Sequence, residues 1–123
     1  MNSSSENFFE HMLVFFPATK EEYLKYRQND YQGLDTIIIE DIFMPEVIKL
    51  LSKNEDIELL KKVFGYFEEV AMCKDEYLLN IFSITVLEIL GNDKHILMTA
   101  QKYMGAKTKE MQVEADRGLG RLV

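Results

Sequence analysis

Four pairs of adjacent carboxylates are the residues of this sequence best suited to chemistry. They are Glu40-Asp41, Glu55-Asp56, Glu68-Glu69 and Asp75-Glu76. Two carboxylates suffice for general acid–base catalysis, provided that burial raises the pKa of one of them. The second and fourth pairs fall in the first turn of predicted helices, where acidic side chains complement the helix dipole. The other two pairs are expected on solvated helix faces, and an enzyme would need a deep pocket around Glu40, Asp41 or Glu68.

No pattern of a metal site or a phosphate site is present in the sequence. The two histidines, His11 and His95, occur in neither HExxH nor ExxH spacing, so helical zinc and di-iron sites are not predicted. The six glycines form neither GxGxxG nor GxxxxGKS/T, and no GxSxG elbow occurs. The single cysteine, Cys73, allows no internal disulfide and is expected at or near the core. We therefore predict no cofactor, no metal and no enzymatic activity.

The acidic side chains are concentrated in the middle of the chain. The formal net charge is −7, and residues 35–93 hold thirteen acids and five bases, whereas residues 94–123 hold three acids and six bases. Direct nucleic-acid binding requires a basic face, so we do not expect it. An acidic surface instead attracts basic proteins, because complementary charge speeds association and adds selectivity. Solvated helix faces and helix caps are the alternative explanation of the same acids.

A partner-binding surface is predicted within this acidic middle segment. Tyrosines often anchor protein interfaces, and two of them flank the acids here. The predicted partner-binding residues are Tyr66, Glu68, Glu69, Asp75, Glu76 and Tyr77.

Apolar spacing predicts an all-α fold of about six or seven helices in one domain, residues 1–123. Apolar residues recur at steps of three and four over 3–16, 57–71 and 78–90, and the last of these helices is apolar nearly all round. An eighteen-residue shift also aligns Glu58, Leu60 and Phe64 with Glu76, Leu78 and Phe82. The fold is therefore either a helix bundle or a short helical-repeat-like stack.

The segment 34–43 is open to two interpretations. Three consecutive β-branched isoleucines, residues 37–39, are typical of a strand, but a single strand would have no partner. We favour a helix that starts at Asp35 as N-cap and breaks near Met44-Pro45, because proline suits the first turn of a new helix.

Polar residues between the apolar segments predict the helix boundaries. Thr19 and Glu22 have capping-box spacing. Further N-caps are expected at Asn54, at Asp75 and at Asn92 or Asp93, and the last helix is expected to begin at Thr108.

The N-terminal sequence contains no signal-peptide pattern. Glu6 and Glu10 interrupt the place where an apolar segment would run, and the longest uncharged stretch, residues 77–87, is too short to span a bilayer. We therefore expect a cytoplasmic protein without membrane contact.

The last two thirds of the chain resemble small helical bacterial immunity proteins encoded beside secreted toxins. The resemblance is in the acidic aromatic helix FGYFEEV, the apolar helix with Leu87, Glu88 and Leu90, and the turn formed by Tyr103, Met104 and Gly105. It implies a cytoplasmic inhibitor that binds and occludes the active site of a cognate toxin, for example in contact-dependent growth inhibition. Toxins of this kind are often basic nucleases, which an acidic partner would suit. The alternative is a helical-repeat-like regulatory or scaffolding domain that binds a non-toxin protein.

Overall fold

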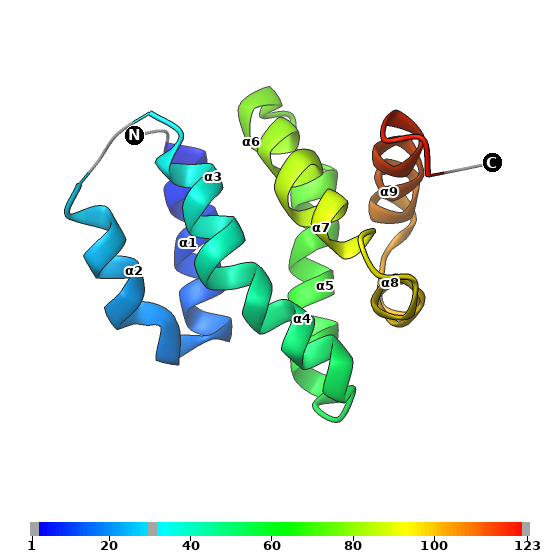
Figure 1. The fold of residues 1–123 in the computed structure, drawn as a ribbon, viewed down its shortest axis with the longest axis horizontal. Coiled ribbons are helices and arrows are strands. Elements are labelled where there is room, and N and C mark those ends of the chain that lie inside the picture. The colour runs from blue at the N-terminus through cyan, green and yellow to red at the C-terminus, as the bar shows by residue number, and fades with distance from the viewer. Residues whose placement is uncertain (1–2, 30–31, 122–123) are drawn as a thin grey trace.

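A computed structural model describes residues 3–29 and 32–121, which form helices joined by short turns and include no strand (Figure 1). The all-α prediction is confirmed. The helices are α1 (Ser3–Phe15), η1 (Pro17–Thr19), α2 (Lys20–Arg27), α3 (Leu34–Ile38), η2 (Ile39–Phe43), α4 (Met44–Lys53), α5 (Ile57–Ala71), α6 (Glu76–Ile81), η3 (Phe82–Leu87), α7 (Glu88–Leu90), α8 (Lys94–Gln101) and α9 (Ala106–Gly118). Of the described helices, none is both long and apolar enough to cross a membrane.

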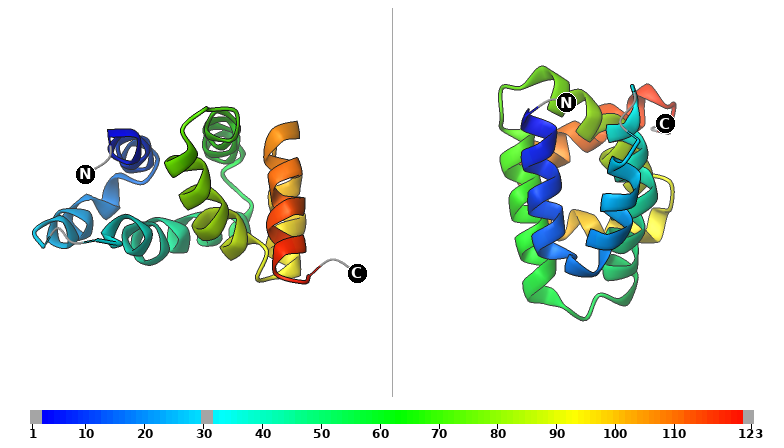
Figure 2. Two further views of the ribbon diagram at one scale, coloured as in Figure 1. Left: turned by 90° about the horizontal axis from the view of Figure 1, so that it is seen from above. Right: turned by 90° about the vertical axis from the view of Figure 1, so that its left-hand side faces the viewer.

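The helices follow one another in two facing rows. Successive helical runs from α1 to α7 alternate in direction, and α2 and α9 lie at opposite ends of the molecule (Figure 1). Seen from above, α1 and α5 form one row, and α3–α4 and α6–α7 form the other (Figure 2). In the first row, α5 contacts α1, and it also contacts α9. In the second row, η2 contacts η3. Of the two architectures left open by the sequence, this arrangement corresponds to the helical-repeat-like stack.

The predicted break at Met44-Pro45 is replaced by a change in hydrogen-bond register. Residues 34–53 form one continuous helical run, in which η2 is a π-helix and the Met44 amide donates to the carbonyl five residues earlier, at Ile39. Pro45 lies in the first turn of α4 and has no amide hydrogen to donate. The wider π turn accommodates this missing donor without ending the helix.

A second π-helix, η3, lies beside the first in the same row. Here the Glu88 amide donates to Ser83, five residues earlier. The buried hydroxyl of Thr85 donates to the carbonyl of Ile81, which it thereby shares with the backbone ladder. The two irregular segments contact each other in the interior, so both changes of register lie at the centre of the second row.

The expected helix starts at Thr19, Asp75 and Asp93 are confirmed, and those at Asn54, Asp35 and Thr108 are wrong. Asp75 caps α6 by accepting from the Leu78 amide at 3.0 Å, and Asp93 caps α8 by accepting from the amides of His95 and Ile96. Asn54 instead ends α4 in the left-handed conformation, with φ 48°, and Asp56 caps α5. The two candidates for the α5 cap are only two residues apart, which is within the error of boundary prediction.

Three more capping residues have other roles. Gly33, with φ 89°, precedes α3, and Asp35 is buried within that helix. Thr19 is at the N-cap position of α2, as expected, but its hydroxyl donates to the Phe16 carbonyl at 2.7 Å and makes no cap bond with α2. The last helix begins at Ala106, and Thr108 is a buried residue of its first turn.

Phe67 lies at the centre of an aromatic cluster that joins the two rows. Its ring is fully buried and lies 5.1 Å from Phe64, 5.4 Å from Phe82 and 6.4 Å from Phe8, measured between ring centroids. These contacts connect α5 with α1 and with η3. Burial of such rings is the main favourable term in the folding of a domain of this size.

We expect Phe67→Ala to lower the free energy of unfolding by about 3–5 kcal/mol, because it removes a fully packed ring and leaves a cavity. This is a large part of a total of roughly 5–15 kcal/mol. Leu24→Ala on α2, where the side chain is 52% exposed, is the control and should change stability by about 0.5 kcal/mol or less. Urea denaturation of both variants measures this, and equal effects would contradict the central position of Phe67.

Candidate functional site

The six predicted partner-binding residues lie at the corner between α5 and α6. We call this region, residues 66–79, the α5–α6 corner. It comprises the last turns of α5, a connection over residues 72–75 and the first turn of α6. The structure therefore brings the six residues to one part of the molecule, but it gives them different surroundings, and only some of them face solvent.

Glu68 is used inside the fold, where it holds the N-terminus of α9. Its carboxylate accepts hydrogen bonds from the Lys107 amide at 3.0 Å, from the Thr108 amide at 2.8 Å and from the Thr108 hydroxyl at 2.8 Å. Desolvation raises the pKa of Glu68, but these three hydrogen bonds and the nearby Lys107 charge outweigh it, so the pKa is lowered. A carboxylate at this place also complements the helix dipole. Glu68 thus attaches α9 to α5.

Gly105 leaves the space that this carboxylate occupies. A Cβ atom on Gly105 would lie 2.4 Å from Cδ of Glu68, closer than atoms can approach. The backbone of Gly105 is extended, with φ −76° and ψ 175°, so its conformation would suit any residue. The glycine is therefore needed for room and not for backbone freedom.

Tyr66 is only 8% exposed and forms one wall of a small cleft between α5 and α1. Its ring is stacked on His11, with ring centroids 4.0 Å apart and planes 9° apart. Burial, together with the charge of Glu69 and the nearby Cys73, raises the pKa of Tyr66, so its hydroxyl keeps its proton and remains a donor. We call this hollow of about 220 Å³, which Glu69 and Cys73 also line, the polar cleft.

Asp75 and Tyr77 connect α6 to its surroundings. Asp75 is the N-cap of α6, and the hydroxyl of Tyr77 donates to the buried carboxylate of Asp35 at 2.7 Å. Desolvation first, and then this bond and the charge of Asp35, raise the pKa of Tyr77 to about 12. Tyr77 is nevertheless 43% exposed, so part of this residue is accessible from solvent.

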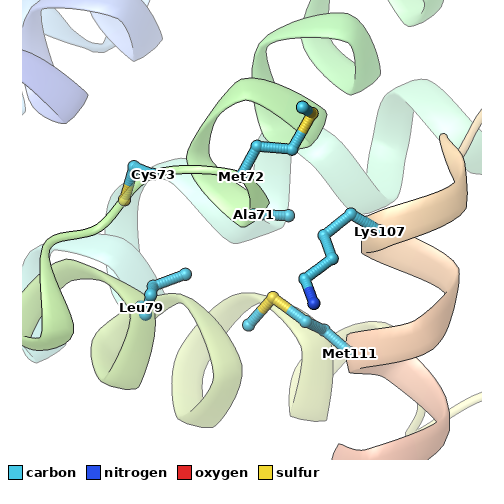
Figure 3. A pocket seen from close by; sticks show the side chains of 6 residues that line it. All are labelled: Ala71, Met72, Cys73, Leu79, Lys107 and Met111. Atoms are coloured by element: carbon cyan, nitrogen blue, oxygen red, sulfur yellow. The ribbon is translucent and has the colours of Figure 1, made fainter.

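An apolar hollow of about 540 Å³ lies on the other side of α5, toward α9. Its lining residues are Ala71, Met72, Cys73, Leu79, Lys107 and Met111. Figure 3 shows Met72 above the hollow and Met111 and Leu79 below it, with the Lys107 ammonium reaching in from α9. Met72 is 66% exposed, and methionine adapts its shape to different partners. We call this region the apolar hollow.

Two acids of the corner are left without a cation. Glu69 and Glu76 are both exposed, and neither forms an ion pair within the part of the chain that the structure describes. The corner holds four acids and one base, the exposed Lys74, and so presents a net negative charge beside apolar surface. Protein interfaces commonly combine apolar surface with charged side chains of this kind.

Glu40, Asp41 and Glu68, around which an acid–base enzyme would need a deep pocket, are not fully buried. Glu40 and Asp41 are exposed, and Asp41 accepts a hydrogen bond from Tyr26 at 3.1 Å. The pKa of Glu68 is lowered, whereas a general acid would need it raised. In residues 3–29 and 32–121, no three side chains of His, Cys, Asp or Glu are grouped so that they could hold a metal ion.

Sequence reasoning missed the residues that neighbouring helices contribute to the corner. His11 comes from α1, and Lys107 and Met111 come from α9. Local spacing carries no information on which helices are neighbours. Gly105 was the available signal, because a glycine directly before a helix can mark a close approach by another side chain.

The comparisons with known proteins place the chain in a family. Residues 9–119 match the family described as Domain of unknown function (DUF7674). The chain belongs to this family. The matched segment includes the whole α5–α6 corner and α9. No curated protein and no solved structure matches the chain.

We expect Glu68→Ala to destabilise the domain by about 1–2 kcal/mol, the cost of removing a helix cap. Glu69→Ala, one residue further along the same helix, should cost about 0.5 kcal/mol or less. The stabilisation by Glu68 is complete above its ordinary pKa of 4.5 and is lost as the pH falls through its lower value in the folded state. The difference between wild type and Glu68→Ala in urea denaturation should therefore shrink at acidic pH.

A double-mutant cycle with Gly105→Ala is the control for this interaction. The new methyl group would displace the Glu68 carboxylate, so its cost should fall when Glu68 is already alanine. Additive costs, or an equal cost for the Glu69 variant, would contradict the role of Glu68.

Proposed function

We propose that this chain is an acidic protein-binding domain that recognises a basic protein through the α5–α6 corner. More specifically, we propose that the chain is an immunity protein that binds a cognate nuclease-type toxin and occludes the toxin's active site. The corner supports the general form, and the resemblance to immunity proteins of contact-dependent growth inhibition systems motivates the specific one. The protein itself would perform no catalysis.

One observation carries the proposal, namely that exposed apolar surface and unpaired acids occur together at the corner. Met72 and Tyr77 are large exposed side chains, and Glu69 and Glu76 beside them have no cation within the described residues. Interfaces combine an apolar centre with a charged rim, and the charges steer the encounter. Met72 and the apolar hollow would form the centre of this interface, and Glu69 and Glu76 would form its rim.

Inhibition would follow from occupation of the basic cleft of a nuclease. Such a cleft binds the phosphate backbone through Lys and Arg side chains. Carboxylates held on a rigid helix corner can take the place of those phosphates. The corner is rigid because Glu68 holds α9 on one side of it and the Tyr77–Asp35 hydrogen bond holds α3 on the other. Binding would therefore need little ordering of the inhibitor.

A regulatory or scaffolding domain that binds a non-toxin protein is the second candidate. It is favoured by the two-row arrangement of the helices, since stacked helical repeats commonly present extended surfaces to partner proteins (Figure 2). The same corner would then bind a basic partner without an inhibitory role.

The charge of the corner can be tested by reversing Glu69 and Glu76 together to lysine. We expect this double variant to bind the partner at least tenfold more weakly, a loss of about 1.4 kcal/mol or more, with a slower association rate. The matched control reverses Glu55 and Glu58, two exposed acids at the other end of α5, and should bind as wild type does. Surface plasmon resonance measures both rates, and an unchanged affinity for the first variant would remove this interface.

Genetics separates the two candidates. For an immunity protein, deleting the gene should be lethal or strongly inhibitory in cells that carry the cognate toxin and neutral in cells that lack it. Growth competition between the single and double deletion strains measures this. A growth defect that persists without the toxin gene would favour the regulatory role.

A further inference from the structure

The polar cleft is lined by hydrogen-bond acceptors for which the described part of the chain supplies no donor. His11 lies on α1, and its Nδ1 donates to the carbonyl of Asn7 at 2.9 Å. Since a carbonyl oxygen only accepts, Nδ1 carries a proton, and this hydrogen bond selects the tautomer in which Nε2 is an acceptor. The ring is held in place by its stacking on Tyr66. His11, with its ring orientation fixed in this way, lines the cleft.

Glu69 adds a negative charge to the same cleft. Its carboxylate is exposed, lines the cleft and forms no ion pair within residues 3–29 and 32–121. It is also close enough to act on the Tyr66 hydroxyl through its charge. Glu69 and the stacked rings of His11 and Tyr66 therefore line the same hollow of about 220 Å³. These groups are complementary to a planar cation that carries several hydrogen-bond donors.

We propose that the polar cleft binds one guanidinium group, supplied by an arginine of the basic partner. Arginine presents a planar fork of donors that matches a carboxylate in bidentate geometry, and it packs well against aromatic rings. Glu69 receives the fork, and His11 Nε2 receives a further N–H. The ammonium of lysine is a point charge without this fork. The choice of an arginine from a protein rests on the proposed function, whereas the guanidinium site itself does not.

The test uses a small probe and requires no partner. Nα-acetyl-arginine amide is titrated into the full chain while NMR follows the ring protons of His11 and Tyr66. We expect saturable shifts with a Kd on the order of 1–10 mM, as for a small number of charge-assisted contacts. The isosteric but uncharged Nα-acetyl-citrulline amide should give none, and Nα-acetyl-lysine amide should bind several-fold more weakly.

Matched variants show whether the arginine probe binds in the polar cleft. Glu69→Gln should weaken binding of the arginine probe at least fivefold, and Glu76→Gln, outside the cleft, should leave it unchanged. His11→Phe should retain the ring stack and lose the acceptor, so it should also weaken the binding. Absence of shifts at His11, an equal response to citrulline, or an equal loss in the Glu76 variant would overturn the guanidinium site.

The outcomes distinguish this inference from the proposed function. If the arginine probe binds in the cleft but reversal of Glu69 and Glu76 leaves the partner's affinity unchanged, the guanidinium site stands and the docking surface is overturned. If the probe does not bind but the reversal weakens the partner, the docking surface stands and the guanidinium site is overturned.

Discussion

The position of α5, packed on α1 and on α9 by two different kinds of contact, is the constraint on which the rest of the structure depends. Toward α1 and η3 the contact is apolar and centres on the buried ring of Phe67. Toward α9 it is polar, because the carboxylate of Glu68 receives the first amides of that helix. Since both sides of α5 are in use, its C-terminal end projects between them as a corner, with the polar cleft on one side and the apolar hollow on the other. Cys73 lines both.

The acidic side chains in and around the corner divide into those that accept hydrogen bonds within the fold and those that remain at the surface. Glu68, Asp75 and Asp35 satisfy donors of α9, α6 and Tyr77, and in these roles they are structural. Glu69 and Glu76 satisfy no donor within the described residues and remain at the surface. Part of the excess negative charge of residues 35–93 is thus used within the fold, and the proposed recognition would depend on the part that remains at the surface.

Periodicity predicted the helices well, because their stability depends on apolar faces that local spacing reveals. The residues at which helices begin, end or change register were harder to predict. Asp56 rather than Asn54 caps α5, and the expected break at Pro45 became a π turn, since small shifts of register cost little. The predicted site was gathered at one corner, but Tyr66 is buried and Glu68 caps α9. The burial of Tyr66 and the capping role of Glu68 both depend on which helices pack against α5, and local spacing in the sequence does not predict helix neighbours.

The measurement that tests the central claim most directly is capture of the tagged protein from its native cells, with mass spectrometry of the bound proteins and stepwise elution by salt. The account predicts one stoichiometric basic partner that elutes at high salt, since screening weakens exposed charge pairs. The same partner should be missing when Glu69 and Glu76 are reversed to lysine and present when Glu55 and Glu58 are reversed. No stoichiometric partner, or one retained equally by both variants, would contradict recognition through the α5–α6 corner.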